Sequence, residues 1–224
     1  QEQFSSQVQR YSKIGFTDFK IKLSGKFQLD NDNIRHLNTT ITNSRIRLDA
    51  NNLWINWRYA ADYIKRLGFD FLGVEEPLAH GDFEGMQKFS NSINTPVILD
   101  ESFLRYEHFK HIKSSPKNWL INLRISKMGG VLRSIEIAKQ AENLGLPLII
   151  GAQVGETSIL SRAALSIANH YRDLVIAQEG AFGTYLLEKD ITEAPIIFGK
   201  DGVLESSSIT TNSYGWGINV RTLE

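Results

Sequence analysis

The chain has 224 residues, with 25 basic and 25 acidic side chains and therefore no formal net charge. This balance gives no reason to expect a nucleic acid or an anionic membrane surface as a partner. Because there is no cysteine, disulfides, zinc–thiolate sites and thiol nucleophiles are excluded. No apolar run is long enough to span a bilayer and there is no secretory start, so we expect a cytoplasmic protein.

Helical and extended patterns alternate along the chain. Apolar residues at helical spacing, often followed by glycine or proline, predict helices at residues 1–15, 53–67, 83–92, 106–113, 132–144 and 158–170. Residues 28–43 are polar and only weakly periodic, which is compatible with an exposed helix. Short apolar or alternating runs predict strands at residues 16–23, 46–49, 71–75, 97–100, 119–124, 147–151 and 174–177. Residues 126–130 carry two glycines and indicate a turn.

The predicted strand ends recur about every 25 residues, which is the size of one βα unit. A period this steady over seven units favours a (β/α) TIM-type barrel over an open doubly wound sheet. Because a complete barrel has eight strands, we expect a barrel that lacks its first strand at the N-terminus. The expected barrel domain covers residues 1–183, and an irregular C-terminal tail covers residues 184–224.

Three carboxylates stand at the ends of consecutive predicted strands, namely Asp49, Glu75 and Asp100. Parallel strands point their C-terminal ends the same way, so these side chains can converge. Carboxylate oxygens suit Mg²⁺, with Mn²⁺ as an alternative ion. Each acid could instead cap the following helix. Three such acids in a row, each with a second polar group nearby, favour a metal site.

Two lysines, Lys20 and Lys22, lie on one face of the strand that precedes Asp49. They could belong to an edge strand and point into water. Beside a divalent cation, however, Lys22 could act as a general base. Arg124 ends a later strand, and Lys127 follows one turn on. A metal, a base and an opposing cation suit removal of a proton α to a carboxylate, with stabilisation of the enediolate.

Polar residues also follow the last two predicted strands. Gln153 and Glu156 follow one of them, and Gln178 and Glu179 follow the other. Polar groups at strand ends of a barrel often contact substrate, so we expect these four to bind it. For Glu156 the alternative is a favourable position at the positive end of the next helix.

Five motifs follow one another along the chain: Phe19-Lys20-Ile21-Lys22, Asp49-Ala50-Asn51, Val74-Glu75-Glu76-Pro77, Asp100-Glu101-Ser102 and Lys127-Met128-Gly129-Gly130. In residues and order they resemble the motifs of the enolase superfamily. The resemblance is greatest to its muconate-lactonising and mandelate racemase-like branch, which includes o-succinylbenzoate synthases and dipeptide epimerases. The resemblance implies Mg²⁺ at Asp49, Glu75 and Asp100, with Lys22 as the base. It also implies a capping domain that closes over the substrate, and residues 1–15 do not resemble such a domain.

One residue departs from the family pattern. Where the branch usually carries a second catalytic lysine, this chain has Arg124. Arginine keeps its charge at any working pH and is a poor base. We therefore expect a one-base lyase or cycloisomerase acting on a small carboxylate. The alternatives are an α-carbon racemase or epimerase that uses Lys22 and Lys127, and a barrel that binds a ligand without turnover. A homo-oligomer is compatible with all three readings.

Overall fold

The computed structural model describes residues 2–180, 186–204 and 215–221. The chain divides into two compact units, Gln1–Ile121 and Asn122–Glu224. The boundary predicted between residues 183 and 184 lies outside the described residues. Within the described part of the chain, no helix is both long and apolar enough to cross a membrane.

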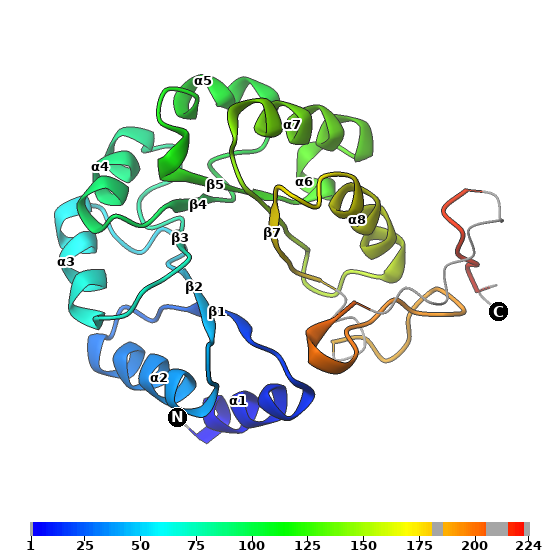
Figure 1. The fold of residues 1–224 in the computed structure, drawn as a ribbon, viewed down its shortest axis with the longest axis horizontal. Coiled ribbons are helices and arrows are strands. Elements are labelled where there is room, and N and C mark those ends of the chain that lie inside the picture. Colours follow the sequence, from blue (N-terminus) through cyan, green and yellow to red (C-terminus); the bar gives the residue numbers. More distant parts are fainter. Residues whose placement is uncertain (1, 181–185, 205–214, 222–224) are drawn as a thin grey trace. The chain divides into compact units, whose positions relative to one another are not determined.

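The first unit alternates strands and helices, with α2, α3 and α4 along one face of its strands (Figure 1). Its helices are α1 (Glu2–Ile14), α2 (Phe27–Thr40), α3 (Trp57–Leu67), α4 (Phe83–Ile93) and α5 (Phe109–Ile112), with short 3-10 turns at Tyr106–His108 and Pro116–Asn118. Its strands are β1 (Asp18–Lys22), β2 (Arg45–Asp49), β3 (Gly73–Glu75), β4 (Val97–Leu99) and β5 (Trp119–Leu123), the last of which runs into the second unit.

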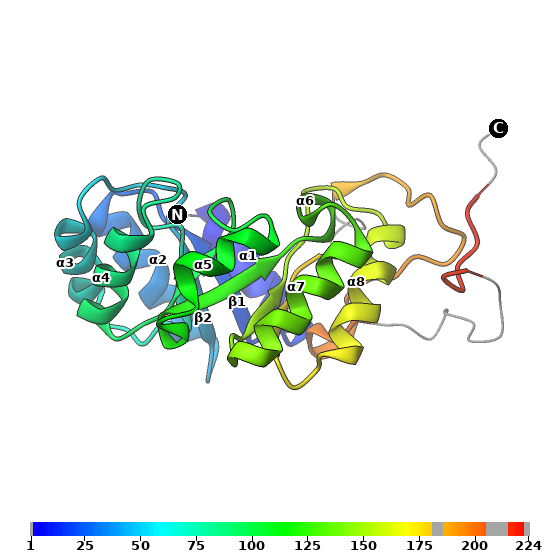
Figure 2. The same ribbon diagram turned by 90° about the horizontal axis from the view of Figure 1, so that it is seen from above.

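The second unit continues the same alternation. It contains α6 (Ile125–Met128), α7 (Val131–Leu144), β6 (Leu148–Ile150), α8 (Ser158–His170), β7 (Val175–Gln178) and a 3-10 turn at Lys200–Gly202. Helices α7 and α8 lie side by side (Figure 2). The tail is tied to the N-terminus of α8 by Asp190, whose carboxylate accepts hydrogen bonds from the Ser158 amide at 3.0 Å and hydroxyl at 2.8 Å.

The described strands are hydrogen-bonded neighbours in chain order, from β1 to β7, and run parallel. Sequential parallel order with intervening helices is the topology of a (β/α) barrel. With seven strands among the described residues, the predicted fold class, an incomplete barrel, is confirmed.

The central strands form the core, as their apolar sequences predict. Leu48, Val74 and Val97, at paired positions on β2, β3 and β4, are each fully buried. Burial of one such side chain contributes about 1.5–3 kcal/mol. This rigid core holds the strand ends, where the predicted site residues lie.

Two local predictions were wrong. The helix expected from residue 53 begins at Trp57, because Asn56 caps it by accepting a hydrogen bond from the Arg58 amide at 2.9 Å. Before that cap, Trp54 forms a bridge with Leu78 instead of joining the helix. The expected turn at residues 126–130 is partly the short helix α6, which ends at Met128 and is followed by Gly129 in the left-handed region.

Candidate active site

The predicted base and two of the predicted metal ligands stand at matching positions on three adjacent strands. Lys22 on β1 pairs in register with Asp49 on β2, and Asp49 pairs with Glu75 on β3. All three are the last residues of their strands. Their backbones are therefore one strand spacing apart, about 4.8 Å between neighbours, at the same edge of the sheet.

The third predicted ligand is offset from this row. Glu75 pairs with Ile98 on β4, so Asp100 lies two residues beyond that position, in the turn after the strand. Both Glu75 and Asp100 are buried, whereas Asp49 is half-buried. Buried carboxylates need a cation or several hydrogen-bond donors to offset the cost of removing them from water.

The two lysines of β1 have partners among these groups. Lys20 Nζ lies 3.3 Å from Glu75 Oε2 in an ion pair whose carboxylate is 3% exposed. Lys22 Nζ donates a hydrogen bond of 3.0 Å to Asn51 Oδ1. The edge-strand alternative is correct in that β1 begins the strand order, but both ammonium groups contact side chains of the site. The backbone amide of Asn51 also donates a hydrogen bond of 3.1 Å to Asp49 Oδ1.

The helix-capping alternative for the three acids is wrong. The N-cap of α3 is Asn56, and that of α4 is Asp82, whose carboxylate accepts from the Gly85 amide. The 3-10 turn that follows Asp100 begins after Arg105. None of the three predicted ligands caps these elements, so their position at the strand ends requires another explanation.

The donor set suits a hard divalent ion, because all three groups are carboxylates at one edge of the sheet. Across the described ranges, however, no three histidine, cysteine, aspartate or glutamate side chains are grouped closely enough to hold a metal. Glu75 contacts Lys20 and Asp49 contacts the Asn51 amide. A bound ion would share or replace these contacts after rotation of the carboxylates. The metal site stays a prediction.

Sequence reasoning undervalued Glu76, which lies directly after Glu75. Its carboxylate is buried and accepts hydrogen bonds from the Asp100 amide, the Ser102 amide and the Ser102 hydroxyl, at 2.7, 2.8 and 2.7 Å. Burial raises the pKa of Glu76, although these hydrogen bonds oppose the shift. Two adjacent acids at the end of an apolar strand are the signal that could have identified it, since one of them must point away from the other.

In the second unit, Arg124 directly follows β5 and precedes α6, which contains Lys127. Both side chains are half-buried. Gly151, at the end of β6, leaves room for the neighbouring side chains. A Cβ there would lie 1.9 Å from Asn122 Oδ1 and 2.7 Å from Arg124 Cγ. The glycine thus allows the side chains of β5 to lie against the end of β6, an arrangement that the sequence did not reveal.

The four predicted substrate contacts all lie in this unit. Gln153 donates its amide to Glu156 Oε2 at 3.0 Å and its side chain to Ser126 Oγ at 3.2 Å. Gln178 ends β7, and the Glu179 amide after it bonds to Ile150 O at 2.7 Å. Burial raises the pKa of Glu156, whereas the Gln153 amide and the Arg124 charge oppose that shift.

The alternative role for Glu156, at the start of the next helix, receives less support. Its carboxylate bonds within its own loop, and Asp190 supplies the acceptor for the first amide of α8. Burial would raise the pKa of Asp190, but hydrogen bonds from Thr192 and Ser158 outweigh it and lower that pKa. The first backbone amide of α8 therefore has its hydrogen-bond acceptor in the tail.

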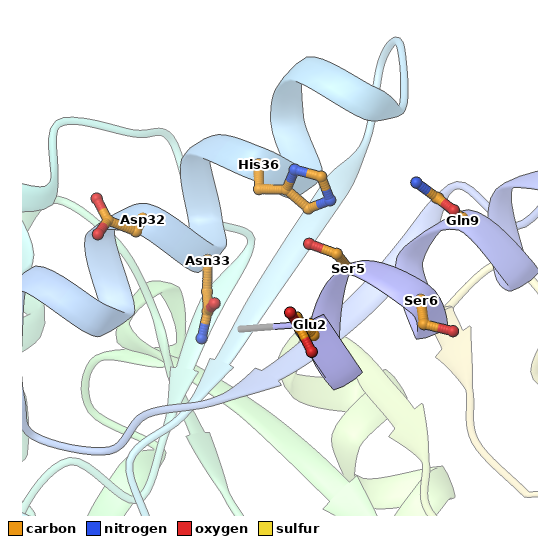
Figure 3. Close-up of a pocket in the computed structure, with 7 residues that line it drawn as sticks. All are labelled: Glu2, Ser5, Ser6, Gln9, Asp32, Asn33 and His36. Carbon is orange, nitrogen blue, oxygen red and sulfur yellow. The ribbon is translucent and has the colours of Figure 1, made fainter.

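A separate pocket lies between α1 and α2 in the first unit (Figure 3). The residues that line it are mostly polar and contain none of the predicted site residues: Glu2, Ser5, Ser6, Gln9, Asp32, Asn33 and His36. It is distinct from the row of strand-end residues on β1, β2 and β3.

Comparison with known families decides the relationship. The sequence profile of the family described as Enolase C-terminal domain-like matches residues 3–223. The chain belongs to this family. The resemblance seen in the five sequence motifs is thereby confirmed, and the order of β1 to β7 is the part of the family fold that the described residues display.

The relatives are isomerases. An L-Ala-D/L-amino acid epimerase of Maribacter sp. is 30% identical over 204 residues, covering 87% of this chain and 56% of the relative. An L-Ala-D/L-Glu epimerase of Francisella tularensis subsp. novicida is 26% identical over 166 residues, covering 72% of this chain and 46% of the relative. This chain thus spans about half the length of the curated relatives it matches.

A solved structure supports the fold. The dipeptide epimerase from Cytophaga hutchinsonii, complexed with Mg and the dipeptide D-Ala-L-Val, matches with a TM-score of 0.83 and 21% identity. The match covers 97% of this chain and 57% of the epimerase chain. The strand and helix order described above is therefore that of the enolase C-terminal domain-like fold.

Proposed function

We propose that the protein containing this chain is a Mg²⁺-dependent isomerase that inverts the α-carbon of one residue of a dipeptide. The observation that carries the proposal is the register of Lys22, Asp49 and Glu75 at the ends of three adjacent parallel strands. The epimerase activity of the relatives supports this reading over the lyase expected from the sequence.

In this proposal Lys22 removes the proton α to the substrate carboxylate. It is exposed on β1 and hydrogen-bonded to Asn51, so substrate can reach its side-chain nitrogen, which accepts the proton as a neutral amine. Mg²⁺, held by Asp49, Glu75 and Asp100, would supply the charge that stabilises the enediolate. Lys20, which contacts Glu75, adds a second positive charge at the same strand ends.

Inversion requires a second group that returns a proton to the opposite side of the substrate carbon. Arg124 keeps its proton and serves as a fixed cation. Lys127, half-buried on α6, can gain and lose a proton, and we assign it that role. Gln153, Glu156, Gln178 and Glu179 contact the substrate, and the two carboxylates suit the terminal ammonium group of a dipeptide.

The test is deuterium exchange in D₂O with pairs of epimeric dipeptides, followed by NMR at the α-carbon. An epimerase exchanges both epimers and interconverts them. We expect Lys22→Met and Lys127→Met each to stop interconversion, with exchange surviving in each variant for one epimer only. No exchange with any dipeptide, in protein shown to bind Mg²⁺, contradicts the proposal.

A one-base elimination or cycloisomerisation is the second candidate, and Arg124 is the residue that favours it. Such an enzyme exchanges the α-proton of one stereoisomer only. It also has no need of Lys127, so Lys127→Met would leave its turnover unchanged. The same set of variants therefore separates the two reactions.

A further inference from the structure

Glu76 has an unusual backbone and a fully engaged side chain. Its φ is +39°, in the left-handed region that residues with a Cβ rarely adopt. The residue is 1% exposed. Residues held in such a conformation usually serve a local purpose that outweighs the strain. Here the conformation separates the carboxylate of Glu76 from that of Glu75 and turns it towards the next strand.

The Glu76 carboxylate binds the turn that follows β4. One oxygen, Oε1, accepts from both the Asp100 and Ser102 amides, and the other accepts from the Ser102 hydroxyl. Hydrogen bonds to a carboxylate are about twice as strong as those between neutral groups. The Asp100 and Ser102 amides thus share an acceptor, Glu76 Oε1, that follows the neighbouring strand β3. Glu76 therefore fixes the backbone at Asp100.

The loop after β3 binds the same turn at two more points. The Gly81 amide donates to Ser102 Oγ at 3.0 Å, and His80 Nε2 hydrogen-bonds to Glu101 O at 2.8 Å. His80 is exposed, and its ring nevertheless contacts the backbone of this turn. All three residues 100–102 are thus held from the segment that begins at Glu76.

We propose that Glu76 is a positioning residue that holds Asp100 in place for the metal. The inference rests on the proposed function, in which Asp100 and Glu75 are ligands of Mg²⁺. Glu75 and Glu76 are consecutive in the chain. The hydrogen bonds of Glu76 to the turn after β4 therefore couple the backbone of Glu75 to that of Asp100. The hydrogen bond to the Asp100 amide thus fixes the backbone from which the Asp100 carboxylate extends.

The experiment compares Glu76→Ala with Glu76→Gln. Glutamine keeps one oxygen for both amides and offers an NH₂ group to the Ser102 hydroxyl, so it should preserve the turn. Alanine leaves both amides without their acceptor. Hydrogen exchange at the Asp100 and Ser102 amides, measured by NMR without added metal, reports the contact itself. Calorimetric titration with Mg²⁺ alone reports its effect on the site.

A matched control comes from another buried carboxylate of the same unit. Asp30 accepts hydrogen bonds from the Ser24 and Gly25 amides and from the Tyr63 hydroxyl. Asp30→Ala should destabilise the unit in the same way but leave Asp100 untouched. Thermal unfolding of each variant sets a temperature at which all are folded, and Mg²⁺ binding is compared there.

We expect Glu76→Ala to weaken Mg²⁺ binding about 10–100-fold, the usual effect of losing a group that orients a ligand. Exchange at the two amides should rise by a similar factor, while Glu76→Gln and Asp30→Ala should bind Mg²⁺ as the wild type does. If Glu76→Ala and Asp30→Ala bind Mg²⁺ equally well, the positioning role is overturned. If the wild type itself binds no Mg²⁺, the proposed function fails first.

A second variant covers the case in which Glu76→Ala does not fold. Ser102→Ala removes the hydroxyl that bonds to Glu76 and accepts from Gly81. It keeps both amide hydrogen bonds to Glu76, so it should weaken Mg²⁺ binding by less than Glu76→Ala would, yet measurably. Mg²⁺ affinity and Asp100 amide exchange both equal to those of the wild type would then overturn the inference.

Discussion

The strand ends of the first unit and those of the second differ in how their polar groups are held. In the first unit, Glu75, Glu76 and Asp100 are buried, and the hydrogen bonds of Glu76 tie the ends of β3 and β4 together. In the second, Gln153 and Glu156 are half-buried and bond within their own loop or to a nearby serine.

The two ways of holding polar groups suit two different roles, chemistry and substrate recognition. A group that holds a metal or moves a proton must keep its position within about half an ångström, which burial and a network of hydrogen bonds provide. Groups that recognise substrate can lie on loops supported by a rigid scaffold, where they vary without damage to the core. We therefore expect changes at the strand ends of the first unit, and at Lys127, to abolish chemistry, and changes at Gln153 and Glu156 to alter which substrate is used.

The largest effect should come from Lys22→Met. Loss of a general base costs about 10²–10⁴-fold in rate. Because Lys22 is exposed and donates its hydrogen bond to the exposed Asn51, stability should change little. The measurements are α-proton exchange and thermal unfolding. Retention of exchange from both epimers would show that the base lies elsewhere.

Asp100→Asn should come next, because the amide removes one anionic ligand. Loss of a group that orients a metal ligand usually weakens metal binding about 10–100-fold. We expect the Mg²⁺ affinity of Asp100→Asn to fall by at least this factor. Calorimetry on wild type and variant measures it. The control is Glu156→Gln, which makes the same change of charge in the second unit and should bind Mg²⁺ as the wild type does. Equal Mg²⁺ binding by the wild type and Asp100→Asn would contradict the three-carboxylate site.

Gly151→Ala tests how far the second unit tolerates change. The added Cβ would meet Asn122 Oδ1 and Arg124 Cγ at distances that no real Cβ shows, so both side chains must move. We expect a destabilisation of about 1–3 kcal/mol, as for other overpacked sites, and an altered position of Arg124. Denaturant unfolding gives the first quantity. The KM for a dipeptide should rise more than kcat falls, and the reverse would place Arg124 in the chemical step.

The smallest effect concerns Glu156 and pH. Burial raises the pKa of Glu156 in the folded state, so the protonated form favours folding. Its contribution to stability is fully present below the unfolded pKa and is lost as pH rises through the folded value. Glu156→Gln should therefore gain stability relative to the wild type between acid and neutral pH. The gain should stay within about 2–4 °C in Tm, and thermal scans at pH 4 and pH 7 measure it.

The sequence by itself determined the positions of the strands and most helices, because apolar periodicity and glycine stops are local signals. It also placed Lys22, Asp49 and Glu75 at strand ends, and regular spacing was enough to predict that they are neighbours. The start of α3 was missed because the Asn56 cap competes with a continuous helical pattern in residues 53–67.

Only the tertiary structure decided the partners of these groups. That Lys20 pairs with Glu75, that Glu76 turns away to hold the Asp100 backbone, and that Gly151 makes room for Arg124 all depend on contacts between segments roughly 25 residues or more apart. Such contacts follow from register and backbone conformation, including the left-handed φ of Glu76, which no local pattern specifies. Spacing along the chain sets which residues reach an edge of the sheet, whereas packing sets which of them touch.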